Sequence, residues 1–331
     1  MIQTKSYPRA AVIGNPSDGY FGKTIAFVFR NFEASVILYE SPELEIMPQE
    51  RDRSVYQSIE GLYQDVQLYG YYGGIRLLKA AIKKFLEHCR ANRVELDKRN
   101  FTIRYHSDIP NRLGLAGSSA IITACMKALM QFYNIKIPKP LLANLVLSVE
   151  TEELGLGAGL QDRVAQAYEQ PVFMDFSKDI MEKRGYGHYE AMSAEWFQNL
   201  YVAYRTDLSE GSEVIHNDLR QRFNRGDEQV TQAMQRFAQI TLEARTCLEN
   251  KNFPELARLM NENFDLRHSI CNISRRNLEM VNLARSVGAS AKFTGSGGAI
   301  IGTFADEKML EILGKKLREN GVEVIVPEVV A

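Results

Sequence analysis

The pattern of apolar and polar residues along the chain predicts a mixture of strands and helices. Apolar residues at every second position, or in one short continuous run, are typical of strands. Apolar residues at spacings of three and four are typical of helices that bury one face. In the first half of the chain these patterns predict strands at 10–13, 25–29, 36–38, 101–105 and 171–176, and helices at 75–89, 121–132, 141–149 and 164–168. Residues 49–72 are polar and rich in tyrosine, and their weak periodicity gives no prediction.

The second half shows the same mixture after a polar, glycine-containing segment at 178–189. Because the composition changes there, we place a domain boundary in this segment and expect domains at 1–185 and 186–331. The expected fold class is α+β. The later patterns predict, in order, a strand at 200–204, helices at 227–249, 253–266 and 274–287, two strands around the glycines at 295–298, a helix from Asp306 and a final valine-rich strand.

Composition and charge narrow the class of protein. The chain has 331 residues, of which 45% are hydrophobic and 24% charged, as in ordinary soluble globular proteins. A net charge of −1 argues against a general binder of nucleic acid or of anionic membranes. Four scattered cysteines and five histidines form no disulfide framework and no zinc motif. With neither a signal-like N-terminus nor a run of transmembrane length, we expect a cytoplasmic protein.

One loop between a strand and a helix has the form of a phosphate-binding site. The strand at 101–105 leads into a glycine-containing loop, and an apolar helical face follows it. Glycines let backbone N–H groups approach a ligand closely, and the first turn of a helix carries unpaired N–H groups and a partial positive charge. One serine of the pair here could cap the helix while the other reaches a ligand or a metal. We call residues 114–120 the phosphate loop. Its candidate phosphate-binding residues are Gly114, Leu115, Ala116, Gly117, Ser118, Ser119 and Ala120.

Two observations bear on that loop taken alone. No lysine precedes the serine pair, so the loop is not a Walker motif. A glycine-rich turn with a serine cap is the simpler interpretation of such a loop in isolation.

The order of motifs around the loop resembles the galactokinase–homoserine kinase–mevalonate kinase–phosphomevalonate kinase (GHMP) superfamily. The second motif of that superfamily matches 110–120 with one extra residue between Leu115 and Gly117, and the third motif resembles Gly295-Ser296-Gly297-Gly298. Within the superfamily the whole chain is most similar to the glucuronokinases. The segments that carry this closer similarity are 14–18, 70–78, 159–166 and 292–298.

The resemblance implies a fold and a catalytic apparatus. It implies an N-terminal domain like ribosomal protein S5 domain 2, a ferredoxin-like C-terminal domain, and a third-motif loop (Gly295, Ser296 and Gly297) that packs against the phosphate loop. It also implies Mg²⁺ held by a serine and by a glutamate twelve residues before a catalytic aspartate. Glu150 and Asp162 have that spacing. The serine is Ser118 by our preference, with Ser119 as the alternative.

Further residues follow from the same resemblance. Glu152 and Glu153 lie close enough to compete with Glu150 as the metal ligand. Asp162 is the expected catalytic base or orienting group. Arg9 is its expected companion, because Arg9, Gly14 and Asp18 keep the spacing of the galactokinase first motif.

The substrate side of the site is expected around the first motif. Galactokinases carry a glutamate where this chain has Asn15, at the position that approaches C6 of the sugar, and a uronate carries its carboxylate there. An asparagine removes the repulsion and offers an amide donor. Lys23, Arg76 or Arg163 could pair with the substrate carboxylate. The tyrosine-rich run at 69–74 could line the nucleotide or the sugar, or be simply the entry to a helix. The candidate substrate-binding residues are Asn15, Asp18, Lys23, Tyr72 and Arg76.

Taken together, these features predict an ATP- and Mg²⁺-dependent sugar 1-kinase that phosphorylates D-glucuronate at C1. The alternatives are a kinase of this superfamily for galacturonate, a neutral hexose or mevalonate, a relative that binds nucleotide or sugar without turnover, and a structural α+β protein. The expected binding partners are a sugar acid and ATP, and neither nucleic acid nor a membrane is expected. The oligomeric state stays open, with a homodimer as one possibility.

Overall fold

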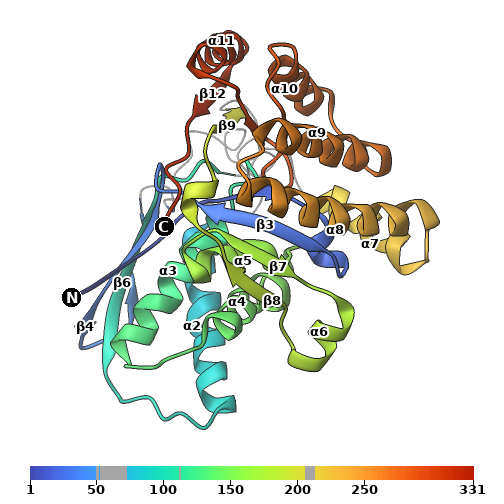
Figure 1. Ribbon diagram of the computed structural model, residues 1–331. Coiled ribbons are helices and arrows are strands. Elements are labelled where there is room, and N and C mark those ends of the chain that lie inside the picture. Colours follow the sequence, from blue (N-terminus) through green and yellow to red (C-terminus); the bar gives the residue numbers. More distant parts are fainter. Residues whose placement is uncertain (50–51, 53–72, 112, 206–212) are drawn as a thin grey trace, which may run out of the picture.

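The computed structural model describes the chain except residues 50–51, 53–72, 112 and 206–212. Three four-stranded sheets are flanked by helices (Figure 1). The segment without a sequence prediction, 49–72, lies almost entirely outside the described residues, and so does the candidate Tyr72. Within the described ranges no helix has the length and apolar character needed to cross a membrane.

The first sheet has the order β1-β4-β6-β5 and contains the strand that leads into the phosphate loop. β1 pairs antiparallel with β4, and β4 pairs antiparallel with β6 along its whole length. Helix α3 packs against β1, β4 and α2. The elements are β1 (Ile2–Ser6), β4 (Ala34–Ser41), β5 (Glu45–Ile46), β6 (Asn100–Ser107), α2 (Gly74–Ala91) and α3 (Gly117–Phe132). The predicted strand and helix on either side of the loop are therefore both present.

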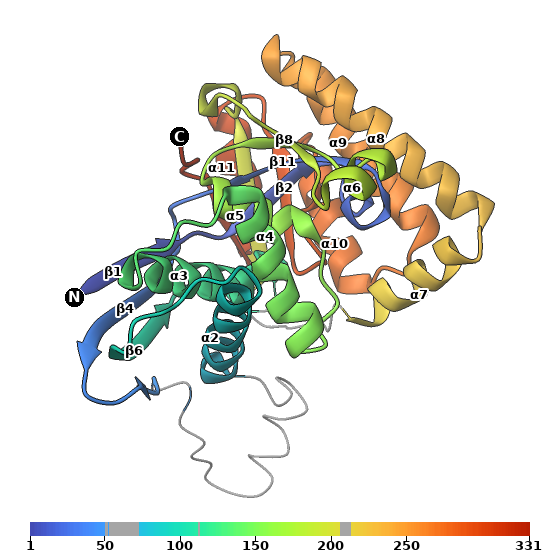
Figure 2. The same cartoon turned by 90° about the horizontal axis from the view of Figure 1, so that it is seen from below.

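The second sheet has the order β2-β3-β7-β8 and is antiparallel throughout. Helix α5 packs against β3 from one side and α8 from the other, as Figures 1 and 2 show. The elements are β2 (Arg9–Ile13), β3 (Lys23–Val28), β7 (Val172–Asp175), β8 (His188–Ala191), α4 (Lys139–Ser148), α5 (Leu160–Tyr168) and α6 (Lys178–Arg184). The pairing of β8 with β7 extends this sheet past residue 185, where we expect the domain boundary, and that boundary stays a prediction.

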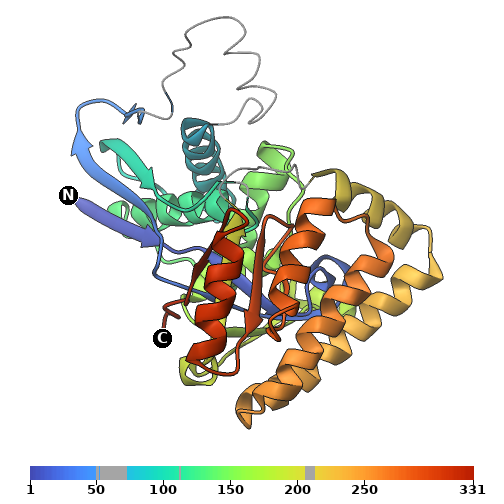
Figure 3. The same cartoon turned by 90° about the horizontal axis from the view of Figure 1, so that it is seen from above.

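The third sheet, of order β10-β11-β9-β12, has the ferredoxin-like arrangement that the resemblance implies. Its strands and helices follow one another as β-α-β-β-α-β, with extra helices after the first strand. Figure 3 shows α8 and α9 side by side, with α11 beside the sheet. The elements are β9 (Leu200–Arg205), β10 (Lys292–Phe293), β11 (Ala299–Thr303), β12 (Val322–Ile325), α7 (Glu213–Asn224), α8 (Glu228–Glu249), α9 (Phe253–Ile270), α10 (Arg275–Arg285) and α11 (Glu307–Arg318).

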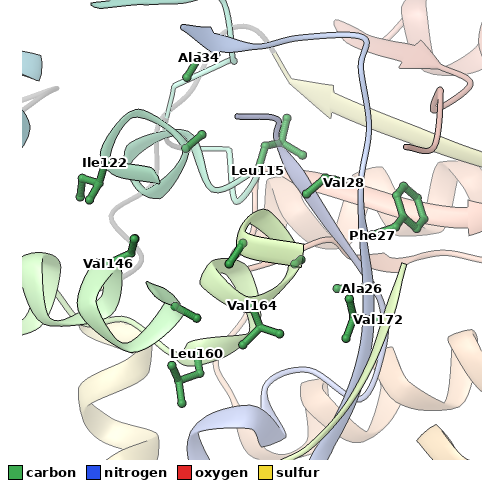
Figure 4. Packing of buried hydrophobic residues seen from close by; sticks show 14 of the residues in the cluster. Ala26, Phe27, Val28, Ala34, Leu115, Ile122, Val146, Leu160, Val164 and Val172 are labelled. Atoms are coloured by element: carbon green, nitrogen blue, oxygen red, sulfur yellow. The ribbon is translucent and has the colours of Figure 1, made fainter. Parts of the chain in front are cut away.

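One hydrophobic core joins the first two sheets and reaches into the C-terminal part. Its residues come from β2, β3, α3, α4 and α5, and also from α8, α9 and β11. Figure 4 shows Leu115, Ile122, Val146 and Val164 pointing into this core. Leu115 belongs to the phosphate loop, so the core itself anchors that loop.

Candidate functional site

The phosphate loop and the third-motif loop meet in one place. Gly114 has a φ of 65°, and a side chain there would place its Cβ 2.8 Å from the carbonyl oxygen of Gly297. A Cβ on Gly295 would lie 2.4 Å from the carbonyl oxygen of Gly114. Both positions therefore require glycine, because any larger residue would push the loops apart. The third-motif loop packs against the phosphate loop, as expected.

Arg9 joins these loops at the start of β2. Its backbone N–H donates to the carbonyl oxygen of Leu115 at 3.0 Å, and its NH1 donates to those of Gly114, at 3.3 Å, and Thr294. Its NH2 lies 2.7 Å from Oδ1 of Asp162. Arg9 is almost wholly buried, so these partners hold its guanidinium in one position. The expected Arg9–Asp162 pair is present as a contact.

Helix α3 begins without a serine cap, which corrects that part of the sequence interpretation. The N-cap residue is Ala116, in the left-handed region with φ 62°, and it offers no side-chain acceptor. Ser119 is fully buried and its hydroxyl donates back to the carbonyl oxygen of Ala116 at 3.1 Å. Both serines lie inside the first turn of α3, which begins at Gly117, and their hydroxyls donate to Glu150 and Ala116, so they do not take up the N–H groups of that turn. These N–H groups are what an anion would contact.

Ser118 points instead at Glu150. Its hydroxyl donates to Oε1 of Glu150 at 2.9 Å. Glu150 lies on a π-helical turn, Val149–Glu153, that continues α4, and its side chain is almost fully buried. Single π-helical turns are frequent at functional sites because they change the direction of side chains within a helix. Of the two serines, Ser118 is the one in contact with the candidate metal-binding glutamate.

The two rival glutamates lie at the surface. Glu152 pairs with Lys84 at 2.6 Å, and Glu153 pairs with Lys83 at 2.5 Å. Both lysines belong to α2, which packs against the π-helical turn. Neither carboxylate therefore competes with Glu150 for Ser118.

Asp162, near the start of α5, has a cation on each carboxylate oxygen. Oδ1 faces Arg9, and Oδ2 lies 3.1 Å from NH1 of Arg163. Burial alone would raise the pKa of Asp162, but the charges of Arg9 and Arg163 and the hydrogen bonds from Arg9 and Gln161 outweigh it. They hold the pKa below its ordinary value of 3.8, so the group is a carboxylate at neutral pH.

Arg163 is bound to protein groups, which argues against its expected role as a partner of the substrate carboxylate. Its Nε donates to Oε2 of Glu150 at 2.7 Å, and its NH2 also contacts that oxygen. Its NH1 donates to the carbonyl oxygen of Gly159 at 2.9 Å and faces Asp162. Burial lowers the pKa of Arg163, but the carboxylates of Glu150 and Asp162 raise it further, so the guanidinium stays charged.

Asp18 lies against the start of α5, on a short 3-10 turn, Ser17–Tyr20. A Cβ on Gly159 would be 2.2 Å from its Oδ2, so glycine there permits the close approach. The backbone N–H of Gln161 points to the same oxygen at 3.5 Å. Burial, and then the charge of Asp162, raise the pKa of Asp18 to about 6.

Asn15 contacts the third-motif loop. Its Nδ2 donates to the carbonyl oxygens of Phe293 and Gly295, at 3.3 and 3.4 Å. Its buried Oδ1 has no hydrogen-bond partner among the described residues. The amide nitrogen is thus engaged within the protein, and the oxygen is the side-chain atom without a partner.

The other two described substrate candidates are also engaged. Lys23 forms an ion pair with Asp175 and donates to Ser177 Oγ at 3.2 Å. Arg76 is exposed, and its NH2 donates to the carbonyl oxygen of Leu154 at 3.1 Å.

Helix α9 supplies residues that sequence reasoning missed. Arg267 is buried and donates to the carbonyl oxygens of Gly295, at 2.7 Å, and Ser296, at 3.1 Å. Asn263 accepts from the N–H of Gly14 at 2.7 Å and donates to the carbonyl oxygen of Asn15 at 3.1 Å. Buried polar positions on an otherwise apolar helix face were the only signal for them.

Lys292 is a further buried cation beside the loops. It donates to the carbonyl oxygens of Ala11 and Phe293, both at 2.7 Å. Burial and the charges of Arg267 and Arg9 hold its pKa well below the usual range.

The site combines a phosphate loop, a serine–glutamate pair and an arginine-bound aspartate. Comparison with known protein families identifies the family to which the chain belongs. The chain belongs to the GHMP kinases: residues 76–170 match the GHMP kinases N terminal domain and residues 244–323 the GHMP kinases C terminal domain. It is 42% identical to Glucuronokinase 1 of Arabidopsis thaliana, over 97% of this chain and 90% of that protein. Probable glucuronokinase 2 of the same plant is 41% identical over 97% of this chain and 89% of that protein.

A solved structure shows the same fold at low sequence identity. Galactokinase of Lactococcus lactis in complex with galactose superposes with a TM-score of 0.76 at 16% identity, covering 99% of this chain and 93% of that one. The expected two-part fold is thereby confirmed.

Proposed function

We propose that this protein is an ATP-dependent glucuronate 1-kinase, which transfers the γ-phosphoryl group of ATP to the C1 hydroxyl of D-glucuronate. The observation that carries the proposal is the Arg9–Asp162 pair beside the Ser118–Glu150 pair at a phosphate loop. The similarity to the Arabidopsis glucuronokinases over nearly the whole chain supports this choice of substrate.

The first turn of α3 would receive the phosphates of ATP. Its N–H groups are not taken up by a side-chain cap of Ala116, and the left-handed Ala116 turns the loop into the helix. The third-motif loop, held by Arg267 through two of its carbonyl groups, would close the nucleotide site from the other side. Backbone donors and a helix N-terminus suit a polyanion.

Asp162 would orient the attacking hydroxyl. A carboxylate whose pKa is held below 3.8 is a weak base, so it does not remove a sugar hydroxyl proton before transfer begins. It accepts a hydrogen bond from that hydroxyl, aims its oxygen at the phosphorus, and takes the proton as the new bond forms. This late proton transfer suits a loose phosphoryl-transfer transition state, in which positioning dominates. Arg9 keeps Asp162 ionised and fixed in place.

The donor set of Ser118 and Glu150 fits Mg²⁺. Mg²⁺ prefers hard oxygen ligands and keeps several waters, so one hydroxyl and one carboxylate beside the phosphates suffice. Within the described parts of the chain no cluster of three or more His, Cys, Asp or Glu side chains could hold a metal by itself, which fits a metal that arrives with the nucleotide. When bound, Mg²⁺ would neutralise charge on the phosphate oxygens.

The sugar would lie between Asp162 and Asp18. Asp18 and the buried Oδ1 of Asn15, which has no partner among the described residues, would accept hydrogen bonds from sugar hydroxyl groups. Of the three basic candidates for the uronate carboxylate, Lys23 and Arg163 are bound to protein carboxylates, and Arg76 is an exposed residue bound to a backbone carbonyl group.

The decisive test measures ADP release against a panel of D-glucuronate, D-galacturonate, D-glucose, D-galactose and mevalonate, followed by ³¹P NMR of the product. We expect kcat/KM to be highest for glucuronate and the phosphate to be on C1. A preference for another panel member would keep the assignment as a kinase and change the assigned substrate. No turnover of any member, with ATP still bound, would favour a non-catalytic relative.

A further inference from the structure

We infer that Arg163 is a positioning residue that fixes the separation and orientation of Glu150 and Asp162 by bridging them. The inference rests on the proposed function, since it assigns these carboxylates their parts in phosphoryl transfer. It gives a role to a residue that the sequence offered only as one of three possible partners of the substrate carboxylate.

The contacts of Arg163 are divided between two carboxylates and one carbonyl group. The edge formed by Nε and NH2 faces Oε2 of Glu150, with Nε at 2.7 Å. The opposite nitrogen, NH1, lies 3.1 Å from Oδ2 of Asp162 and 2.9 Å from the carbonyl oxygen of Gly159. One planar group thus connects the π-helical turn that carries Glu150 with the first turn of α5.

These contacts determine which oxygens stay available for chemistry. Arg163 occupies Oε2 of Glu150, so Oε1 is left to Ser118. On Asp162, Arg163 and Arg9 approach different oxygens, which fixes the carboxylate plane. A bidentate guanidinium has a fixed fork geometry, whereas a lysine ammonium is a point charge on a flexible chain. The bridging shape therefore matters as much as the charge.

Burial makes the arrangement rigid. The side chains of Arg163 and Glu150 are 5% and 2% exposed, so water does not replace a lost contact. Asp18 brings a third carboxylate to the start of α5. Without the bridge, carboxylates in a buried region repel one another and turn apart.

The test compares Arg163→Lys, which keeps the charge, with Arg163→Gln, which removes it. Arg236→Lys is the matched control, because Arg236 also bridges two carboxylates, with Nε 2.6 Å from Glu262 and NH1 2.8 Å from Glu243, on α8 and α9 away from the site. The full chain is assayed with whichever sugar the wild type phosphorylates. A wild type without turnover would count against the proposed function and not against the bridge.

For Arg163→Lys we expect kcat to fall about 10- to 100-fold while the sugar KM stays within about threefold. Arg236→Lys should leave kcat unchanged. In the Glu150→Gln and Asp162→Asn backgrounds, Arg163→Lys should lower kcat much less than in the wild type, because the groups that Arg163 positions are already disabled. If Arg163→Gln does not fold, the lysine variant and these double variants still decide the question.

A crystal structure of metal-free Arg163→Lys gives a readout that does not depend on turnover. We expect the hydrogen bond between Ser118 and Glu150 to be lost, because Oε2 no longer has its two donors. The inference is overturned if both carboxylates keep their places. It is equally overturned if Arg163→Lys retains wild-type kcat, or if its loss of activity only follows the fraction of unfolded protein.

Discussion

Asp18 offers a test in which stability and function change in opposite directions. Its pKa rises from 3.8 to about 6 in the folded protein, first because it is buried and then because Asp162 is close. Each unit corresponds to about 1.36 kcal/mol, so ionising Asp18 in the folded state costs up to about 3 kcal/mol. The residue keeps some contact with solvent, and we therefore expect a cost of about 1–3 kcal/mol.

The sign of the pH dependence follows from the raised pKa. From pH 3.8 to about 6 the folded protein holds a proton that the unfolded chain releases, so rising pH lowers the free energy of unfolding. The cost is fully present above that window and absent below it. Asp18→Asn removes the cost, because an amide of the same size does not ionise.

The expected change in Tm can be worked out from the chain length. The entropy of unfolding is about 2.1 cal/mol/K per residue, or about 0.7 kcal/mol/K for 331 residues. Asp18→Asn should therefore raise Tm by about 1.5–4 °C at pH 8, with the gain vanishing near pH 4. Differential scanning calorimetry between pH 4 and pH 8 measures this difference. The same variant should bind the sugar less tightly, because a charged acceptor for its hydroxyl groups is lost.

Asp175 provides the control of opposite sign. Burial raises its pKa, but Lys23 and Ser177 outweigh that effect and lower it. Asp175→Asn should therefore lower Tm at pH 8. A lower Tm for Asp18→Asn at pH 8, or an equal gain at pH 4 and pH 8, would refute the reasoning.

Three further predictions concern the site. Asp162→Asn should lower kcat by about 10²–10⁴-fold in steady-state kinetics, while calorimetry should show that ATP and sugar still bind. A near-normal kcat would remove Asp162 from the mechanism. Ser118→Ala should raise the Mg²⁺ concentration needed for half-maximal rate, whereas Ser119→Ala should mainly lower Tm, and the reverse result would exchange their roles. Asn15→Glu should lower kcat/KM for glucuronate by about 10- to 100-fold through charge repulsion. It should also lower Tm, because a carboxylate would face the carbonyl group of Phe293. An equal loss of kcat/KM for glucuronate and glucose would show that the position does not sense C6.

Local sequence pattern was enough for the elements that carry the site. The strand before the phosphate loop, the helix after it and the turn between β10 and β11 follow from alternation, helical spacing and glycine positions. Short polar elements were missed. β1 has only Ile2 as an apolar position to signal it, because its buried positions are Thr4 and Ser6, and α6 has no buried residue.

Motif spacing by itself predicted most of the candidate site residues, and the tertiary structure decided what each of the described ones contacts. The spacing to Asp162 favours Glu150 but leaves Glu152 and Glu153 as rivals. The π-helical turn buries Glu150 and leaves the other two to lysines of α2. Arg163 and Asp162 are neighbours in sequence, yet burial between α5 and the turn made one of them the bridge between two carboxylates.

The loops also depend on α9, where Arg267 lies more than a hundred residues from the phosphate loop in sequence. Local periodicity records only whether a position is buried. The partner of a buried charge, and so its pKa and its function, is set by whichever distant segments pack against it.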